Sequence, residues 1–282
     1  MKQLAAFARF LHFSNLLVCV AMATLCFQTA LLLDWLFIPE WFYLFIFSST
    51  FLLFCLRDLN YKKAGRLQET RAAFLIRYSK YFIPFIGIAL VLSGYLLFKL
   101  KGAQLSLLIL PGLLAIVYCL PLDTCRSRLQ QIALNWIVPV IVCSFITTVL
   151  PASFIPYGFD NKFWWLLMFR FSWLLALLFT SKIVAIKIDH PKPVNETGTM
   201  SHRNGYLLIA YAAIATAIIS FFFAFRTGFP LELIIALLVS LIITVLTIRY
   251  RLRHPFSLAA LLLVSLCIIL QTMLVCIATL IP

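Results

Sequence analysis

Two acidic residues, Asp58 and Asp189, are the strongest candidates for chemistry in this chain. The sequence holds only nine Asp and Glu residues, and these two lie where apolar stretches give way to long basic segments. Carboxylates in such places could hold Mg²⁺ against a lipid diphosphate, because magnesium prefers hard oxygen ligands shared between carboxylates and substrate phosphates. The alternative is that both are solvated partners of neighbouring cations at helix ends, and their spacing alone favours that alternative.

Basic residues accompany both carboxylates, and a further pair follows the fourth apolar stretch. Such side chains could neutralise the charge of a diphosphate through charge-assisted hydrogen bonds. The candidates for this role are Arg57, Lys62, Lys63, Arg66, Arg126, Arg128, Lys187 and Arg203.

Other polar residues are weaker candidates. Arg170 falls inside an apolar stretch, where a charge is a functional hypothesis by default, but we expect it to snorkel to the outer interface roughly 10 Å away. Tyr118 and Asn135 could line a headgroup pocket or form ordinary bonds between helices. His190 and His202 lack further metal ligands nearby, so we expect exposed loop histidines.

The elements that must position these residues are membrane-spanning helices. The chain is 64% hydrophobic and 11% charged, whereas soluble proteins are about 45–50% apolar and about 25% charged. A spanning helix needs about 20 mostly apolar residues. The sequence predicts an all-α membrane protein of one domain, 1–282, with nine such helices at 14–33, 39–56, 81–98, 104–121, 131–150, 163–181, 205–225, 229–248 and 256–281.

Lys and Arg counts predict the orientation of these helices. With a cytoplasmic N-terminus, the inner segments hold 18 of the 23 basic residues and the outer segments four, while Arg170 lies within a span. This asymmetry follows the positive-inside rule and places the C-terminus on the opposite side. The apolar run up to Leu33 exceeds the hydrophobic region of a signal peptide, so we expect the first stretch to remain as a span.

Charge and cysteine content exclude two other classes. The net charge of +14 could suggest nucleic-acid binding, but the basic residues are spread over helix ends, where topology and anionic lipid headgroups account for them. The eight cysteines form no CxxC pair and mostly lie within spans. They therefore indicate neither a disulfide framework nor a zinc site.

Two long inner connections, 57–80 and 182–204, are separated by four predicted spans. Their recurrence suggests two four-helix halves followed by a ninth helix, with the two connections forming a cap over the candidate site. Within the first connection, 66–78 predicts either a short amphipathic helix on the inner leaflet or an extension of the third span.

The chain resembles the UbiA superfamily of intramembrane prenyltransferases. The resemblance covers essentially the whole chain and rests on the nine-span count, the start RFLHFSNLL, the segment VYCLPL followed by two arginines, and Thr199, Met200 and Gly205. In the family, two acidic motifs follow the second and sixth helices, which corresponds here to Asp58 and to Asp189 with Glu196. Each motif in this chain carries fewer carboxylates than is usual in the family.

The resemblance implies a prenyltransferase that moves a prenyl group from a prenyl diphosphate to a lipophilic or aromatic acceptor within the membrane. It implies Mg²⁺ held by Asp58, Asp189 and Glu196, with the loop cations on the diphosphate and apolar helix walls around the isoprenoid tail. The alternative is a catalytically degenerate member that binds an isoprenoid or anionic lipid, or supports a membrane complex. A small-solute transporter is disfavoured, because the chain lacks paired broken helices.

Overall fold

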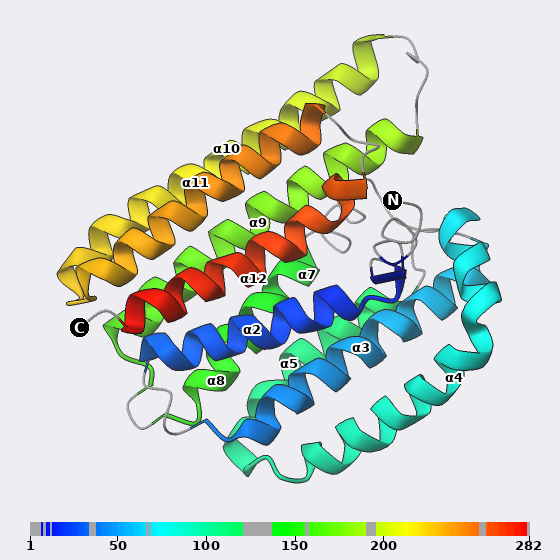
Figure 1. Cartoon of the computed structure of the whole chain (residues 1–282), viewed down its shortest axis with the longest axis horizontal. Coiled ribbons are helices and arrows are strands. Elements are labelled where there is room, and N and C mark those ends of the chain that lie inside the picture. Colours follow the sequence, from blue (N-terminus) through cyan, green and yellow to red (C-terminus); the bar gives the residue numbers. More distant parts are fainter. Residues whose placement is uncertain are drawn as a thin grey trace.

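Figure 1 shows the computed structural model of the chain, whose helices form one bundle. It describes residues 7, 10–11, 13–33, 38–65, 67, 69–120, 137–155, 158–189, 196–253 and 258–280. For 69–70, 179–189, 196–207, 251–253 and 258–261 only the backbone is described. No strand occurs within the described residues, which confirms an all-α fold for that part of the chain.

The described helices follow one another along the chain. Their bounds are α2 (Leu16–Leu33), α3 (Glu40–Lys63), α4 (Glu69–Leu97), α5 (Gly102–Cys119), α7 (Val138–Ser144), the π-helical turn η4 (Phe145–Val149), α8 (Leu150–Ala152), α9 (Asn161–Asp189), α10 (Glu196–Arg226), α11 (Leu231–Arg253) and α12 (Leu258–Leu280).

Seven of these helices have the length and composition of membrane spans. They are α2, α3, α4, α5, α10, α11 and α12, as judged over the described residues. The continuous segment Val138–Ala152 is a shorter apolar helix, and the described part of α9 carries Lys162 and Arg170. The structure therefore supports a multi-pass membrane protein, while the count of nine spans stays a prediction.

Both inner connections are shorter than the sequence predicted. In place of a loop at 57–80, α3 continues to Lys63 and α4 begins at Glu69. In place of a loop at 182–204, α9 continues to Asp189 and α10 begins at Glu196. Hydropathy marks where a helix leaves the apolar region, not where its backbone hydrogen bonds end, so the predicted two-loop cap is largely helical. The segment 69–80 is an extension of α4, the second of the two predicted alternatives.

Gly65 marks the end of the α3 extension. Its φ of 68° lies in the left-handed region, which glycine adopts without steric cost and which commonly terminates a helix. The Gly65 N–H donates to the carbonyl of Lys62 at 3.0 Å, and the Ala64 N–H donates to the carbonyl of Asn60 at 3.0 Å. Asp58 therefore lies inside α3, about a turn and a half before its end.

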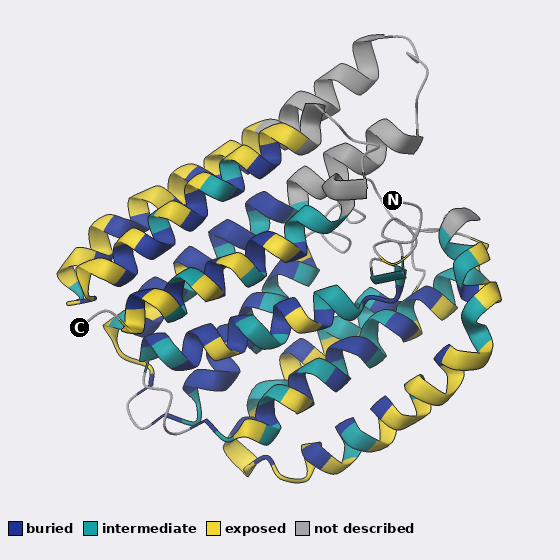
Figure 2. Cartoon of the chain, viewed as in Figure 1, coloured by how far each residue is buried: buried dark blue, intermediate teal, exposed yellow. Residues whose placement is uncertain are grey.

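The bundle is built around α2. Helix α2 packs against α3 on one side and α12 on the other; α12 in turn packs against α11, and α9 packs against α10 and α11. In Figure 2 the coloured parts of α2 and α9 are mostly buried or intermediate, whereas those of α4, α10 and α11 are exposed along one side. Residues such as Val91 (73% exposed) and Phe222 (72% exposed) face outward, as expected where lipid is the solvent.

Helix α4 lies at the edge of the bundle and packs mainly against α3. It is bent in Figure 1 and contains Pro84, which has no N–H for the helical hydrogen bond and displaces the preceding turn. Helix α5 packs against α3 and α7 instead. Helices α4 and α5 thus leave space between them beside α3, and the candidate site lies along this space.

Candidate functional site

Asp58 is buried at the centre of a polar cluster near the end of α3. Its side chain is 1% exposed. One carboxylate oxygen, Oδ2, accepts hydrogen bonds from Arg71 Nη2 at 2.6 Å, Arg71 Nε at 3.0 Å and Asn15 Nδ2 at 3.0 Å. Both arginine contacts converge on this single oxygen, and Arg71 Nη2 also donates to Asn15 Oδ1 at 2.5 Å. We call Asn15, Asp58 and Arg71 the Asp58 triad.

The triad joins three segments at one end of the bundle. Asn15 directly precedes α2, Asp58 lies in α3 and Arg71 lies in the first turn of α4. Asn15 has a φ of 60°, a left-handed conformation that asparagine tolerates better than most residues. Phe10 and Phe13 also contact Phe74 on α4, with ring centroids 5.9 and 5.5 Å apart. The segment before α2 is therefore held against α4 by both polar and aromatic contacts.

Sequence reasoning did not find Asn15 or Arg71. Arg71 counted only as one of several inner cations, because no pattern pairs it with Asp58 across 13 positions of chain. Asn15 stands inside an apolar stretch, and a lone asparagine there ordinarily bonds to a neighbouring helix. An asparagine beside the start of a span and an arginine beside the next span are common, so neither residue carried a distinguishing signal.

Arg57 forms a second polar group on α3, directed at α5. One guanidinium nitrogen, Nη1, donates to the hydroxyl of Tyr118. The guanidinium carbon lies 4.8 Å from the Tyr118 ring centroid and 5.4 Å from that of Tyr61, both within cation–π range. Asn60 Nδ2 donates to the Cys119 carbonyl at 3.3 Å. Arg57 and Tyr118, both candidate site residues, therefore lie together near the ends of α3 and α5.

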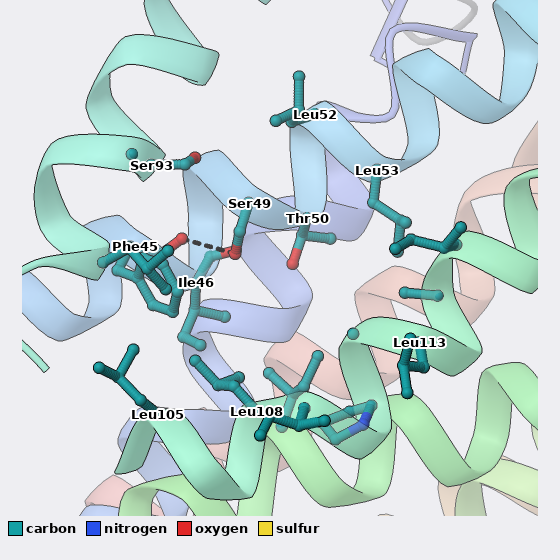
Figure 3. Close-up of a pocket in the computed structure, with 18 of the residues that line it drawn as sticks. Phe45, Ile46, Ser49, Thr50, Leu52, Leu53, Ser93, Leu105, Leu108 and Leu113 are labelled. Carbon is teal, nitrogen blue, oxygen red and sulfur yellow. Dashed lines mark hydrogen bonds between the residues drawn. The ribbon is translucent and has the colours of Figure 1, made fainter. Parts of the chain in front are cut away.

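An open apolar groove of about 640 Å³ runs between α3, α4 and α5. Figure 3 shows its walls, with Phe45, Thr50 and Leu53 from α3 and Leu105 and Leu113 from α5. A smaller cavity of about 30 Å³ adjoins it and includes Tyr118 in its lining. The two spaces have Thr50, Leu53, Ala115 and Ile146 in common. Tyr118, which bonds Arg57, therefore lines the smaller cavity beside the groove rather than the groove itself.

The remaining predicted site residues are described only in part. Lys62 is half-buried and Lys63 exposed in the last turn of α3. For Asp189, Lys187, Glu196, Arg203 and His202 the structure describes the backbone alone, with Asp189 as the last residue of α9 and Glu196 as the first of α10. Four candidates and one histidine lie outside the described residues: Arg66, Arg126, Arg128, Asn135 and His190.

The described residues do not by themselves fit a magnesium site. Asp58 Oδ2 is occupied by the triad, and Oδ1 is buried without a hydrogen-bond partner. Among the described residues, no three His, Cys, Asp or Glu side chains lie close enough together to hold a metal ion. The Arg71 guanidinium also neutralises the one carboxylate present. A contribution from Asp189 and Glu196 stays a prediction.

Arg170 contradicts its sequence prediction. We expected this side chain to snorkel to the outer interface, yet it is fully buried in the centre of the bundle. Nη1 donates to the carbonyls of Leu25 at 3.1 Å and Thr147 at 3.3 Å, and Nη2 donates to Gln28 Oε1 at 2.7 Å. Acceptors from α2 and η4 therefore replace water, which removes the reason for the side chain to leave the bundle.

The fold and the site define a multi-pass helical membrane protein with a polar cluster near the end of α3 and an apolar groove along earlier turns of that helix. Comparisons of the chain with protein-family models, with curated proteins and with solved structures found no match. Its function is therefore argued below from the residues and their geometry.

Proposed function

We propose that this protein is a UbiA-like intramembrane prenyltransferase with nine spans, an inner N-terminus and an outer C-terminus. In this proposal a prenyl diphosphate enters from the inner leaflet, and its prenyl group passes to a lipophilic or aromatic acceptor. The observation that carries the proposal is the succession of two unlike environments along α3. An apolar groove of about 640 Å³ is lined by α3 residues up to Leu53, and Arg57 and Asp58 of the triad follow about a turn further along the same helix.

A prenyl diphosphate has the same division into two parts. Its diphosphate suits cations that are already oriented by neighbouring groups, and its hydrocarbon tail suits a groove walled by Phe, Leu and Ile side chains. In the transfer, the carbon–oxygen bond to diphosphate breaks and the diphosphate leaves with the electron pair. The allylic carbon then bonds to the acceptor, which gives up a proton. Cations near the leaving group stabilise its developing charge, and the apolar walls keep water from the allylic centre.

The roles of the described residues follow from their positions. Arg57, held by Tyr118, would contact the diphosphate, with Lys62 and Lys63 one to two turns further along α3. Asp58 orients Arg71. Mg²⁺ would supply further charge neutralisation if Asp189 and Glu196 complete a site, but the roles of Arg57, Asp58 and Arg71 do not depend on the metal.

The test is an assay of the purified protein in lipid nanodiscs with labelled prenyl diphosphates of several chain lengths and a mixture of lipid acceptors. Released diphosphate and prenylated lipid are both measured. The proposal expects release that depends on an acceptor and falls at least tenfold in Arg57→Gln, since a lost hydrogen bond to a charged group costs about 1.5–3 kcal/mol. Arg77→Gln, an exposed cation on α4, serves as the matched control.

A second candidate is a non-catalytic lipid-diphosphate binder. The ion pair between Asp58 and Arg71 favours it, because the one described carboxylate of the candidate site is already neutralised. The same assay separates the two candidates. Saturable binding of prenyl diphosphate without any release in the presence of acceptors supports the binder, and the absence of both binding and release overturns both candidates.

A further inference from the structure

The carboxylate that the resemblance assigns to a metal holds a protein cation instead. Asp58 is 1% exposed and gives one oxygen to three N–H donors, two of them from Arg71. A divalent metal and a guanidinium compete for the same charge on a carboxylate. In this chain the guanidinium has the advantage, because it is covalently part of α4 and gives two N–H donors, Nε and Nη2, to the carboxylate.

The triad also fixes how Arg71 is presented. Nε and Nη2 are engaged by Asp58, and Nη2 is shared with Asn15 Oδ1. Among the described residues no acceptor is bonded to the third nitrogen, Nη1, and the side chain is 18% exposed. One edge of the guanidinium is thus anchored and the other is left for a ligand. An arginine oriented in this way loses little conformational freedom on binding a phosphate.

The charge around the triad suits an anion. Arg57, Lys62, Lys63 and Arg71 lie within the last turns of α3 and the first turn of α4, which also hold two acidic residues, Asp58 and Glu69. A surplus of cations at a half-buried position attracts phosphate more strongly than it would in open water.

We infer that Arg71, held in place by Asp58 and Asn15, binds the phosphate end of the lipid ligand, and that this binding needs no divalent metal. The inference rests on the proposed function for the identity of the ligand as a lipid diphosphate. It applies equally to a transferase and to a binder, because it concerns recognition of the headgroup rather than the transfer.

The experiment measures binding of fluorescent farnesyl diphosphate to the full-length protein in nanodiscs of neutral lipid, once with Mg²⁺ and once with EDTA. Binding to the wild-type protein is expected to change less than threefold between the two conditions. Arg71→Gln is expected to weaken binding at least tenfold in EDTA, in line with the loss of a charge-assisted hydrogen bond. Arg77→Gln, on the same helix and exposed, is expected to bind as the wild type does.

Two further variants separate binding from folding. Arg71→Lys keeps the charge but loses the paired Nε and Nη2 donors. Its affinity for farnesyl diphosphate should therefore fall between those of the wild type and Arg71→Gln. Asp58→Asn keeps the shape but releases Arg71, and its affinity should also fall. Thermal unfolding of each variant reports any loss of structure, and the comparison of Mg²⁺ with EDTA on the wild-type protein requires no variant.

The outcomes distinguish this inference from the proposed function. Binding that appears only with Mg²⁺ overturns the role of Arg71 and leaves the prenyl diphosphate ligand in place. Equal affinities of a folded Arg71→Gln variant and Arg77→Gln also overturn it. No binding of farnesyl diphosphate under either condition, or by homologous diphosphates of other lengths, overturns the proposed function and this inference together.

Discussion

Arg170 shows how single residues in this protein satisfy a charge inside the membrane. Its guanidinium donates to two backbone carbonyls and one side-chain amide, contributed by α2 and η4, and it lies in α9. The Thr147 carbonyl also accepts from Thr29 Oγ1 at 2.6 Å. No carboxylate contacts Arg170 within the described part of the chain. The arginine therefore connects three elements through neutral acceptors, and its removal leaves Gln28 Oε1 without this donor, while the Leu25 and Thr147 carbonyls keep their bonds from Thr29 Oγ1.

Replacing Arg170 is expected to destabilise the bundle. In Arg170→Leu, Gln28 Oε1 loses its donor and each buried unpaired group costs about 1–3 kcal/mol. Relief from burying a charge offsets part of this cost, so we expect a net loss of about 1–3 kcal/mol, measured as a lower midpoint of thermal aggregation in detergent. Arg226→Leu, at an exposed position on α10, is the control and should have the same midpoint of thermal aggregation as the wild type. An unchanged midpoint for Arg170→Leu would show that the hydrogen bonds of Arg170 to α2 and η4 do not hold the helices together.

At the scale of the elements, hydropathy located the helices but not their ends. Every predicted apolar stretch contains described helix, because about 20 apolar residues have few other ways to satisfy their backbone in lipid. The polar continuation of α3 was missed, and that of α4 was only one of two predicted alternatives, because polar residues occur both in helices that leave the membrane and in loops. Those continuations bring Asp58 and Arg71 together. The partner of Asp58 could not be predicted, because it depends on how two helices cross.

The π-helical turn η4 could not be predicted from the sequence either. Its wider turn interrupts the regular helical hydrogen bonds of the segment Val138–Ala152. Two of its carbonyls accept from other helices, Ile146 from Cys26 Sγ at 3.7 Å and Thr147 from Thr29 and Arg170. Apolar and β-branched residues such as those of η4 occur in ordinary helices too. The turn is therefore fixed by its partners on α2 and α9, not by local preference.

The connection between α8 and α9 gives a test at this scale. A Cβ atom at Gly158 would lie 2.2 Å from the Ala152 carbonyl oxygen and 3.0 Å from that of Ile155. Because both contacts are with backbone, Gly158→Ala should shift the connection and lower stability by about 1–3 kcal/mol, the usual range for overpacking. Gly87→Ala, on the exposed face of α4 with nothing within 4 Å, should be neutral or slightly stabilising. Equal thermal midpoints for the two variants would contradict the observed close approach.

At the scale of the whole molecule, cations lie over aromatic rings at both ends of the bundle, whereas the Asp58–Arg71 ion pair lies at one end. At one end Arg57 and Arg71 bond to Tyr118, Asp58 and Asn15, beside the apolar groove. At the opposite end, Lys99 lies 5.9 Å from the Trp41 ring centroid and 5.1 Å from that of Tyr95, and Lys162 lies 5.7 Å from the ring of Phe229. Cations over aromatic rings are typical of a membrane interface. The polar end that could bind a ligand is therefore the end predicted to face the cytoplasm.

This orientation can be measured by labelling single cysteines. Lys63 ends α3 at the polar end and Lys101 directly precedes α5 at the other, and both are exposed. In cells that express a variant lacking the native cysteines, a membrane-impermeant maleimide should label Lys101→Cys directly. It should label Lys63→Cys only after permeabilisation, because the inner segments carry 18 of the 23 basic residues. The reverse pattern would place the Asp58 triad on the outer face, where a prenyl diphosphate made in the cytoplasm could not reach it without crossing the bilayer. The same two variants, reconstituted in vesicles of known sidedness, would then locate any diphosphate-binding activity relative to the membrane.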